Sequence, residues 1–283
     1  MAVGFSAKAA LQWSAAFCCL LCVPVPAAAL ASADSPGPLE GMAQAYVARV
    51  DGKTLWSQRA AQELAPASLT KVMTALLILE SYAPEKVITV SASAAAATGT
   101  RLRIRAGERY TQENLLLAML LVSGNDACRA LAEAHSGDAR RFVALMNRRA
   151  AQLGLAHTHF ENACGHDAPD HYSTAQDLMQ LTEVALANPV FAAMVRRPEV
   201  SFESVDGARS FALRNTNELI GRHPDAIGVK SGYTPKAGKC LIALAERGGV
   251  RVLLVMLNVP NRWWDAHAAL DLAFDHAAKA PRQ

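Results

Sequence analysis

The sequence is poor in the features that most quickly place a protein in a class. Only 19% of its residues are charged, and the formal net charge is +3 at neutral pH. Lysines and arginines are scattered rather than grouped, so nucleic acid is not an expected partner. No internal repeat, low-complexity block or Pro/Ser-rich linker interrupts residues 34 to 283. These absences favour one domain of about 250 residues whose apolar content supports a buried core.

A long apolar stretch stands at the N-terminus, after the basic residue Lys8, and ends in Ala31-Ser32-Ala33. This pattern predicts a cleaved secretory signal peptide over residues 1 to 33, and therefore a periplasmic or exported protein. The stretch is long enough to span a membrane, so a retained anchor is the alternative, but Pro24 and Pro26 favour cleavage. A lipid anchor is not expected, because no small residue precedes the cysteines of the stretch, which are Cys18, Cys19 and Cys22.

Cysteine is scarce in the rest of the chain, where only Cys128, Cys164 and Cys240 remain. In an oxidising compartment an odd number permits at most one internal bridge and leaves one thiol free. The spacing does not decide which pair is bridged.

The sequence patterns at the two ends of the domain predict strands. Residues 43 to 58 alternate loosely around Asp51-Gly52, a strong signal for a tight hairpin. Three short strand-like runs begin at residues 226, 239 and 250, and an amphipathic helix from Asn261 to about Ala278 closes the chain. We therefore expect an α/β (α+β) fold, in which an antiparallel sheet built from both chain ends is covered by helices.

The middle of the chain reads as helices. Residues 111 to 137 predict two helices separated by a break at Ser123-Gly124-Asn125. Residues 138 to 155 have helical periodicity with arginines on the outer face, and residues 173 to 186 begin with a Ser/Thr cap before another apolar stripe. Trp263 and Trp264 are expected to pack the closing helix on the sheet.

Ser68 and Lys71 stand three residues apart at the start of a further apolar helical run. A serine hydroxyl needs a nearby base to act as a nucleophile, and residues i and i+3 share a helix face, so Lys71 can reach the Ser68 oxygen. The backbone N–H of Ser68, at a helix start, can also help to hold an oxyanion. Taken alone, the S-x-x-K pattern is weak, because a solvated helix end explains most isolated matches.

Two further motifs follow in a specific order. Ser123-Gly124-Asn125 lies at the helix break, and Lys230-Ser231-Gly232 lies on a predicted strand. Taken singly, Ser123 and Asn125 can be helix caps and Lys230 a surface lysine. The ordered set S-x-x-K, S-x-N, K-[ST]-G resembles the penicillin-recognising serine enzymes.

The sequence around these motifs is similar to that of the D-alanyl-D-alanine carboxypeptidases, the low-molecular-mass penicillin-binding proteins. The similar segments are "PASLTKVMTA", "LLVSGNDA" and "GVKSGYTPKAGKCLIALAER". The resemblance covers residues 40 to 275, including "HYSTAQDL" and "NTNELI". It implies a β-lactamase/transpeptidase-like fold and a serine-type DD-peptidase that acts on peptidoglycan stem peptides ending in D-Ala-D-Ala and is inhibited by β-lactams. It implies no metal or other cofactor.

The resemblance also assigns expected roles. Ser68 is implied as the acyl-enzyme nucleophile, Lys71 as its general base and Ser123 as a proton relay to the leaving group. Asn125 is implied to hold the substrate amide, and Lys230 with Ser231 to bind near the terminal carboxylate. The remaining expected contacts come from the backbone N–H of Tyr233, as second oxyanion donor, and from Gly232, which lets the substrate lie close to the strand.

Some residues depart from the family pattern. Where the family often has N-P-x-G-L, this chain has Asn162-Ala163-Cys164-Gly165-His166, so the loop beside the site is expected to differ. We interpret Cys164 as a small half-buried residue rather than a reactive thiol. Many relatives carry a β-rich module and an amphipathic terminal helix after this domain, whereas this chain stops at Gln283; we expect no stable membrane anchor. Pairs of histidines do not complete a convincing metal site, namely His157 with His159 and His166 with His171.

Three alternatives remain open. A DD-endopeptidase that cleaves peptidoglycan cross-links would use identical groups. A class A-like β-lactamase needs a carboxylate to hold the deacylating water, and Glu161 is its only candidate in a suitable loop. The third alternative is a protein that binds penicillin or senses the cell wall without hydrolysis.

Overall fold

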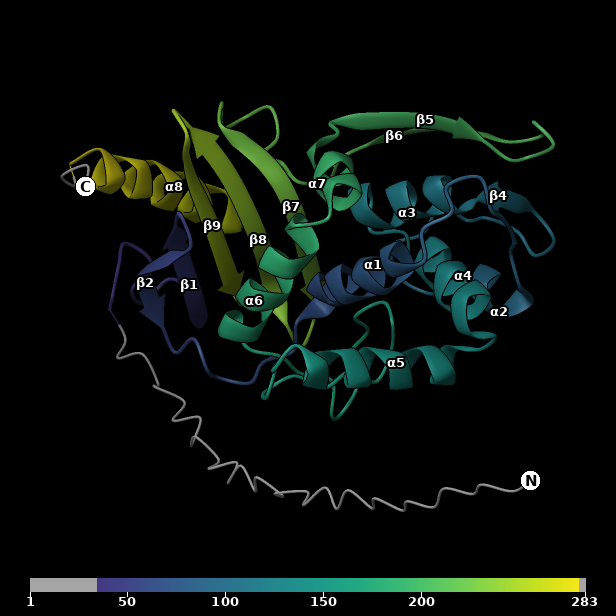
Figure 1. Cartoon of the computed structure of the whole chain (residues 1–283), viewed down its shortest axis with the longest axis horizontal. Helices are drawn as coiled ribbons and strands as arrows, with labels where there is room; N and C mark the ends of the chain where they lie inside the picture. The colour runs from purple at the N-terminus through teal and green to yellow at the C-terminus, as the bar shows by residue number, and fades with distance from the viewer. Residues whose placement is uncertain (1–34, 280–283) are drawn as a thin grey trace, which may run out of the picture. The chain divides into compact units, whose positions relative to one another are not determined.

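Segments from the two ends of the described chain form one antiparallel sheet (Figure 1). The computed structural model describes residues 35 to 279, so the signal peptide expected over residues 1 to 33 lies outside it. The strand order is β2-β1-β9-β8-β7. The strands are β1 (Ala45–Val50), β2 (Lys53–Gln58), β7 (Ala226–Thr234), β8 (Gly238–Arg247) and β9 (Val250–Leu257). The prediction of an antiparallel sheet built from both ends is confirmed.

Local turn chemistry and apolar content explain the sheet. Asp51 and Gly52 both have positive φ, +46° and +78°, as the predicted two-residue hairpin requires. In β9 alternate residues enter two different cores, Leu253 and Val255 on one face and Leu254 and Met256 on the other. The strand is therefore apolar throughout, because both faces of the sheet are covered.

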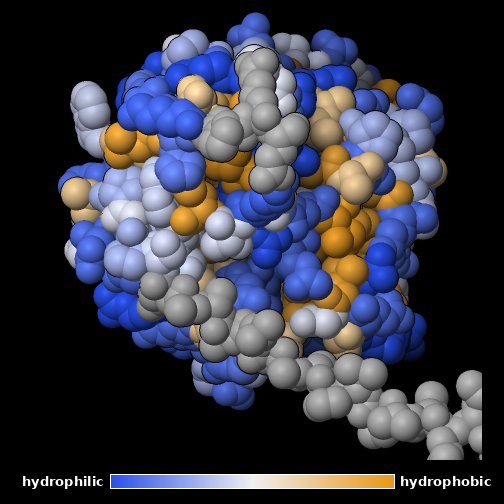
Figure 2. All heavy atoms as spheres, turned by 60° about the vertical axis from the view of Figure 1, so that its left-hand side comes forward, coloured by the Kyte–Doolittle hydropathy of each residue, from blue (hydrophilic) through white to orange (hydrophobic). Residues whose placement is uncertain are grey.

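The helices are divided between the two faces. Helix α8 (Arg262–Lys279) covers one face, and the remaining large helices lie on the other (Figure 1). Trp263 packs partly against the α8 core, but Trp264 is 81% exposed, so the expectation that both tryptophans pack inward is wrong for Trp264. Figure 2 shows hydrophobic residues reaching the surface in separate patches between polar ones.

The second layer is built around α1 (Lys71–Glu80), whose residues 71 to 79 are all buried. A helix that is surrounded by protein can be apolar on every side, and "KVMTALLIL" is almost entirely so. The other helices of this layer are α2 (Ala92–Ala95), α3 (Gln112–Leu121), α4 (Asn125–Ser136), α5 (Ala139–Gln152), α6 (Ala175–Leu186) and α7 (Pro189–Arg196).

The predicted break between α3 and α4 and the predicted cap of α6 are both present, with the Thr174 hydroxyl accepting from the Asp177 N–H at 3.0 Å. Two small antiparallel two-stranded sheets were not predicted: β3 (Val87–Thr89) with β4 (Arg109–Thr111), and β5 (Glu199–Glu203) with β6 (Ser210–Arg214). Within residues 35 to 279 no single helix is long and apolar enough to cross a membrane, whereas α6 and α7 meet that criterion jointly across a 104° bend.

Candidate active site

Ser68 lies in a tight turn between the sheet and α1. The turn is a short 3-10 helix, η1 (Ala67–Thr70), rather than the first turn of an α-helix as the sequence suggested. Ala67 has φ of +48°, an uncommon conformation for a residue with a side chain. The Thr70 hydroxyl donates to the Ala67 carbonyl at 2.8 Å and also contacts His171 Nε2 at 2.8 Å. These contacts hold the turn and leave Ser68 partly exposed.

Lys71 is the first residue of α1 and is fully buried. Its Nζ lies within hydrogen-bond distance of Ser68 Oγ, at 2.9 Å, and donates to Asn125 Oδ1 at 2.8 Å and to the Cys164 carbonyl at 2.6 Å. Burial, reinforced by the positive charge of Lys230, holds the pKa of Lys71 well below its ordinary value. The predicted Ser68–Lys71 contact is therefore present, and the amine next to Ser68 favours its neutral form.

The break between α3 and α4 places a second serine beside an asparagine. Ser123 has φ of +61°, and its buried hydroxyl has no hydrogen-bond partner among the described residues. Asn125 does not cap α4, because the N-cap position belongs to Gly124. The Asn125 side chain instead bridges Lys71 Nζ and the Thr98 carbonyl, which its Nδ2 reaches at 2.7 Å. The amide is thus fixed beside Lys71, and the unpartnered Ser123 hydroxyl is free to bond to a bound molecule.

Strand β7 packs against η1 and brings the third motif to Ser68. A Cβ on Gly232 would stand 2.9 Å from the Ser68 backbone nitrogen, so only glycine allows this approach. Lys230 is 1% exposed and Ser231 is 8% exposed, whereas the Tyr233 side chain is 63% exposed. The interpretation of Lys230 as a surface lysine is therefore excluded.

Lys230 and Arg262 form a second cationic centre. Lys230 Nζ donates to the Ser231 carbonyl at 2.9 Å, and Arg262 Nη1 donates to the Gly232 carbonyl at 2.6 Å. Burial and then the charge of Arg262 lower the pKa of Lys230 to about 7. The positive charge of Lys230 in turn disfavours the protonated form of Lys71. The sequence argument did not include Arg262, which stands on α8 far along the chain.

The segment that departs from the family pattern closes the other side of Lys71. We call residues 162 to 166 the Asn162–His166 loop. A Cβ on Gly165, whose φ is +85°, would meet the Ala67 carbonyl oxygen at 1.9 Å, so this loop lies directly on the Ser68 turn. Cys164 is 6% exposed and forms a disulfide with Cys128, which corrects its interpretation as a half-buried small residue. Cys240 is the free, buried cysteine.

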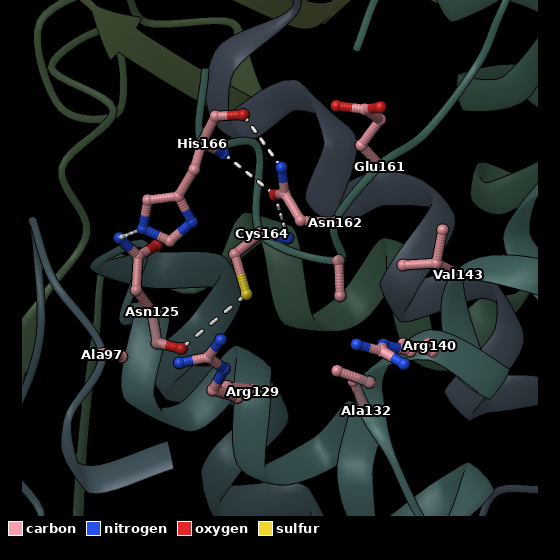
Figure 3. Close-up of a pocket in the computed structure, with 12 residues that line it drawn as sticks. Ala97, Asn125, Arg129, Ala132, Arg140, Val143, Glu161, Asn162, Cys164 and His166 are labelled. Atoms are coloured by element: carbon pink, nitrogen blue, oxygen red, sulfur yellow. Dashed lines mark hydrogen bonds between the residues drawn. The ribbon is translucent and has the colours of Figure 1, made fainter. Parts of the chain in front are cut away.

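A pocket of about 270 Å³ lies beyond this loop, between α4 and α5 (Figure 3). Asn125, Cys164 and His166 form part of its wall, and Arg129 is the cationic side chain that α4 contributes to it. His166 Nε2 is 3.2 Å from Asn125 Nδ2. Glu161 lines the pocket and is exposed; its backbone N–H donates to His171 Nδ1 at 3.0 Å, but its carboxylate forms no hydrogen bond or ion pair with another described side chain. Nothing in its surroundings holds its carboxylate towards Ser68.

The histidines considered from the sequence do not meet as a metal site. His171 instead supports the Ser68 turn, and burial lowers its pKa to about 4. The described residues contain one group with metal-ligand chemistry, His223, His267 and Asp271. Arg247 already pairs with that carboxylate at 2.7 Å, so we interpret the group as part of an ion-pair network.

Comparison with known proteins agrees with this geometry. The crystal structure of the Streptomyces K15 DD-transpeptidase superimposes with a TM-score of 0.79 at 29% identity, covering 83% of this chain and 97% of that one. The fold and the three motifs around Ser68 define the class, namely serine enzymes with the β-lactamase/transpeptidase-like fold. A family model described as D-alanyl-D-alanine carboxypeptidase matches residues 32–261, and the chain belongs to that family.

Several curated relatives are named D-alanyl-D-alanine carboxypeptidases, like the family model. The chain is 36% identical over 251 residues to the D-alanyl-D-alanine carboxypeptidase DacF of Bacillus subtilis, covering 86% of this chain and 64% of that protein. It is 36% identical over 217 residues to DacB2 of Mycobacterium tuberculosis, covering 74% of each chain. A D-alanyl-D-alanine endopeptidase of Pseudomonas aeruginosa is 31% identical over 215 residues. The chain therefore spans just under two thirds of the Bacillus protein.

Proposed function

We propose that this protein is an exported serine-type DD-carboxypeptidase that removes the terminal D-alanine from peptidoglycan stem peptides through an acyl-enzyme on Ser68. The observation that carries the proposal is the 2.9 Å contact between Ser68 Oγ and a buried lysine amine whose pKa is lowered. A neutral amine at this distance can take the hydroxyl proton as Oγ attacks the carbonyl carbon of the penultimate D-alanine.

The other groups fit the later parts of that step. The backbone N–H groups of Ser68 and Tyr233 would stabilise the tetrahedral oxyanion, and the close approach of Gly232 on β7 to the Ser68 nitrogen supports this. The unpartnered Ser123 hydroxyl would carry the proton to the departing D-alanine nitrogen as the peptide bond breaks. Water then attacks the acyl ester, its proton returns through Lys71, and Ser68 is regenerated.

We expect the protein to recognise two polar groups of the substrate, its terminal carboxylate and an amide. The terminal carboxylate matches the cationic centre of Lys230 and Arg262, with the Ser231 hydroxyl as a further donor. Asn125, already fixed beside Lys71, would bond the substrate amide. A β-lactam carries a carboxylate and a strained amide in a similar arrangement, and would acylate the same serine.

The experiment that tests the proposal incubates the purified protein separately with a pentapeptide ending in D-Ala-D-Ala and with cross-linked muropeptides, and follows products by mass. Loss of one alanine from the pentapeptide is the expected result. Cleavage of cross-links alone would assign the chain to the endopeptidases, as named for the Pseudomonas relative. No product from either substrate, with folded protein, would contradict the proposal.

A further inference from the structure

The Lys71 amine is held between two segments that are far apart in the sequence. One acceptor is Asn125 Oδ1, at the first residue of α4, and the other is the carbonyl of Cys164, in the Asn162–His166 loop. Cys128 stands one helical turn after Asn125 and is bonded to Cys164. The disulfide thus joins the two segments that supply the acceptors of Lys71, and the Cys164 sulfur lies 3.7 Å from the Asn125 carbonyl oxygen (Figure 3).

We propose that Cys128 and Cys164 are positioning residues for the reaction, because their disulfide fixes the Asn162–His166 loop against α4 and so keeps Lys71 dry and aimed at Ser68. The inference rests on the proposed role of Lys71 as general base. It assigns a task in the chemistry to a bond that would otherwise count only as a structural crosslink.

Besides the disulfide, hydrogen bonds shape the loop and join it to the rest of the protein, as His166 Nε2 does with Asn125 Nδ2 at 3.2 Å. Asn162 Oδ1 accepts from the backbone N–H groups of Cys164 and His166 (Figure 3), and also from that of Gly165, all of them within the loop. The hydrogen bonds that join the loop to the rest of the protein include Thr74 Oγ1 to the Ala163 carbonyl at 2.6 Å. A few hydrogen bonds of this kind break locally at modest cost, whereas a covalent bond does not.

Opening of the loop would change Lys71 in two ways. The amine would lose the Cys164 carbonyl, so its lone pair would no longer be directed at Ser68 Oγ, and water would enter beside it. The titratable groups that face Lys71 are Lys230 on β7 and His166 on the loop itself. Burial is the largest cause of the lowered pKa of Lys71, so hydration raises that pKa and favours the protonated, inactive form.

The disulfide can be reached without unfolding. Cys164 lines the pocket between α4 and α5 (Figure 3), whereas Cys128 is fully buried. A phosphine reductant entering the pocket can attack the Cys164 sulfur, which breaks the S–S bond and releases the Cys128 thiolate. Water then hydrolyses the phosphonium–sulfur bond, which gives the phosphine oxide and supplies the protons of the two thiols. The bond is therefore testable in the folded protein.

The experiment measures the pH dependence of acylation by a labelled β-lactam, with binding and acylation steps separated, for oxidised protein, reduced protein and Cys128→Ala/Cys164→Ala. Thiol counting by mass after alkylation verifies each redox state. We expect the acylation step to slow on the order of 10²-fold, with its acidic limb moved to higher pH. The matched control is Leu270→Ala, which creates a cavity on α8, in the core on the opposite face of the sheet. It should lower the stability of the protein but leave the acylation rate and the position of the acidic limb unchanged.

The outcomes separate the two proposals. If the oxidised protein is acylated on Ser68 and the reduced, folded protein reacts at the same rate with the same pH profile, the disulfide has no positioning role and this inference is overturned. If the double variant does not fold, the reduced wild-type protein decides the question alone. If the oxidised protein is not acylated, the proposed function is wrong, and the inference fails with it.

Discussion

A buried lysine kept for function should weaken the fold, and Lys230 allows this to be measured. Its amine is fully buried, and burial together with Arg262 lowers its pKa from 10.5 to about 7. The unfolded chain holds the proton up to pH 10.5, so folding at neutral pH must desolvate or neutralise the amine. Lys230→Met keeps the length of the side chain and removes the charge, and we expect it to stabilise the protein.

The magnitude follows from the same values. A fall in pKa from 10.5 to about 7 corresponds to about 5 kcal/mol, at about 1.4 kcal/mol per pH unit. The variant also loses the bond from Lys230 Nζ to the Ser231 carbonyl, and an unpaired buried acceptor costs about 1 to 3 kcal/mol. The net gain expected at pH 7 is therefore about 2 to 4 kcal/mol in the free energy of unfolding.

The pH dependence tests the cause. Between pH 7 and 10.5 the unfolded wild-type chain binds more protons than the folded one, so wild-type stability rises with pH and the advantage of Lys230→Met disappears. Urea unfolding at pH 7 and pH 10 measures both values, and Lys53→Met, at an exposed position on β2, controls for the loss of one charge. A Lys230→Met variant that is less stable than wild type at pH 7, or equally stabilised at pH 10, would refute the reasoning.

Three further outcomes are expected. Gly165→Ala should cost roughly 3 kcal/mol or more and slow acylation, because its Cβ meets the Ala67 carbonyl at 1.9 Å; Gly248→Ala, also at positive φ but with open space, should cost only about 1 kcal/mol in the same urea titration. Lys71→Arg should lower the acylation rate by roughly 10² to 10⁴, since a guanidinium cannot act as the base, while Lys230→Arg should lower it less. If Lys71→Arg is folded by circular dichroism and is acylated as fast as wild type, Lys71 has no part in the mechanism. We expect the penicillin adduct to decay slowly, because the exposed Glu161 is not held towards Ser68 to activate water, and Glu161→Gln should leave that decay unchanged; fast turnover of penicillin by the wild-type protein that Glu161→Gln abolishes would indicate a β-lactamase.

The elements that the sequence predicted well are those with local causes. Asp51-Gly52 imposes its hairpin, Thr174 caps its helix, and the apolar runs of β8 and β9 reflect burial on both faces. The two small two-stranded sheets were missed because β3 and β5 are short and half exposed, so packing against the helical layer rather than their own pattern stabilises them.

The sequence predicted which residues form the site, but not how they are arranged. Residue spacing indicated that Lys71 reaches Ser68, but not that Ser68 lies in a 3-10 turn or that Gly165, from a distant segment, packs against Ala67 of that turn. The Cys128–Cys164 pairing and the arrival of Arg262 from α8 are likewise long-range. A local sequence pattern does not predict which distant residues come into contact.

The central claim is that Ser68 becomes covalently acylated with the help of Lys71. The most direct measurement digests the protein after reaction with a labelled penicillin and locates the added mass by peptide sequencing. The account predicts one adduct per chain, on the peptide that contains Ser68, and none in Ser68→Ala. An adduct that survives Ser68→Ala, or its absence from folded wild-type protein, would contradict the account.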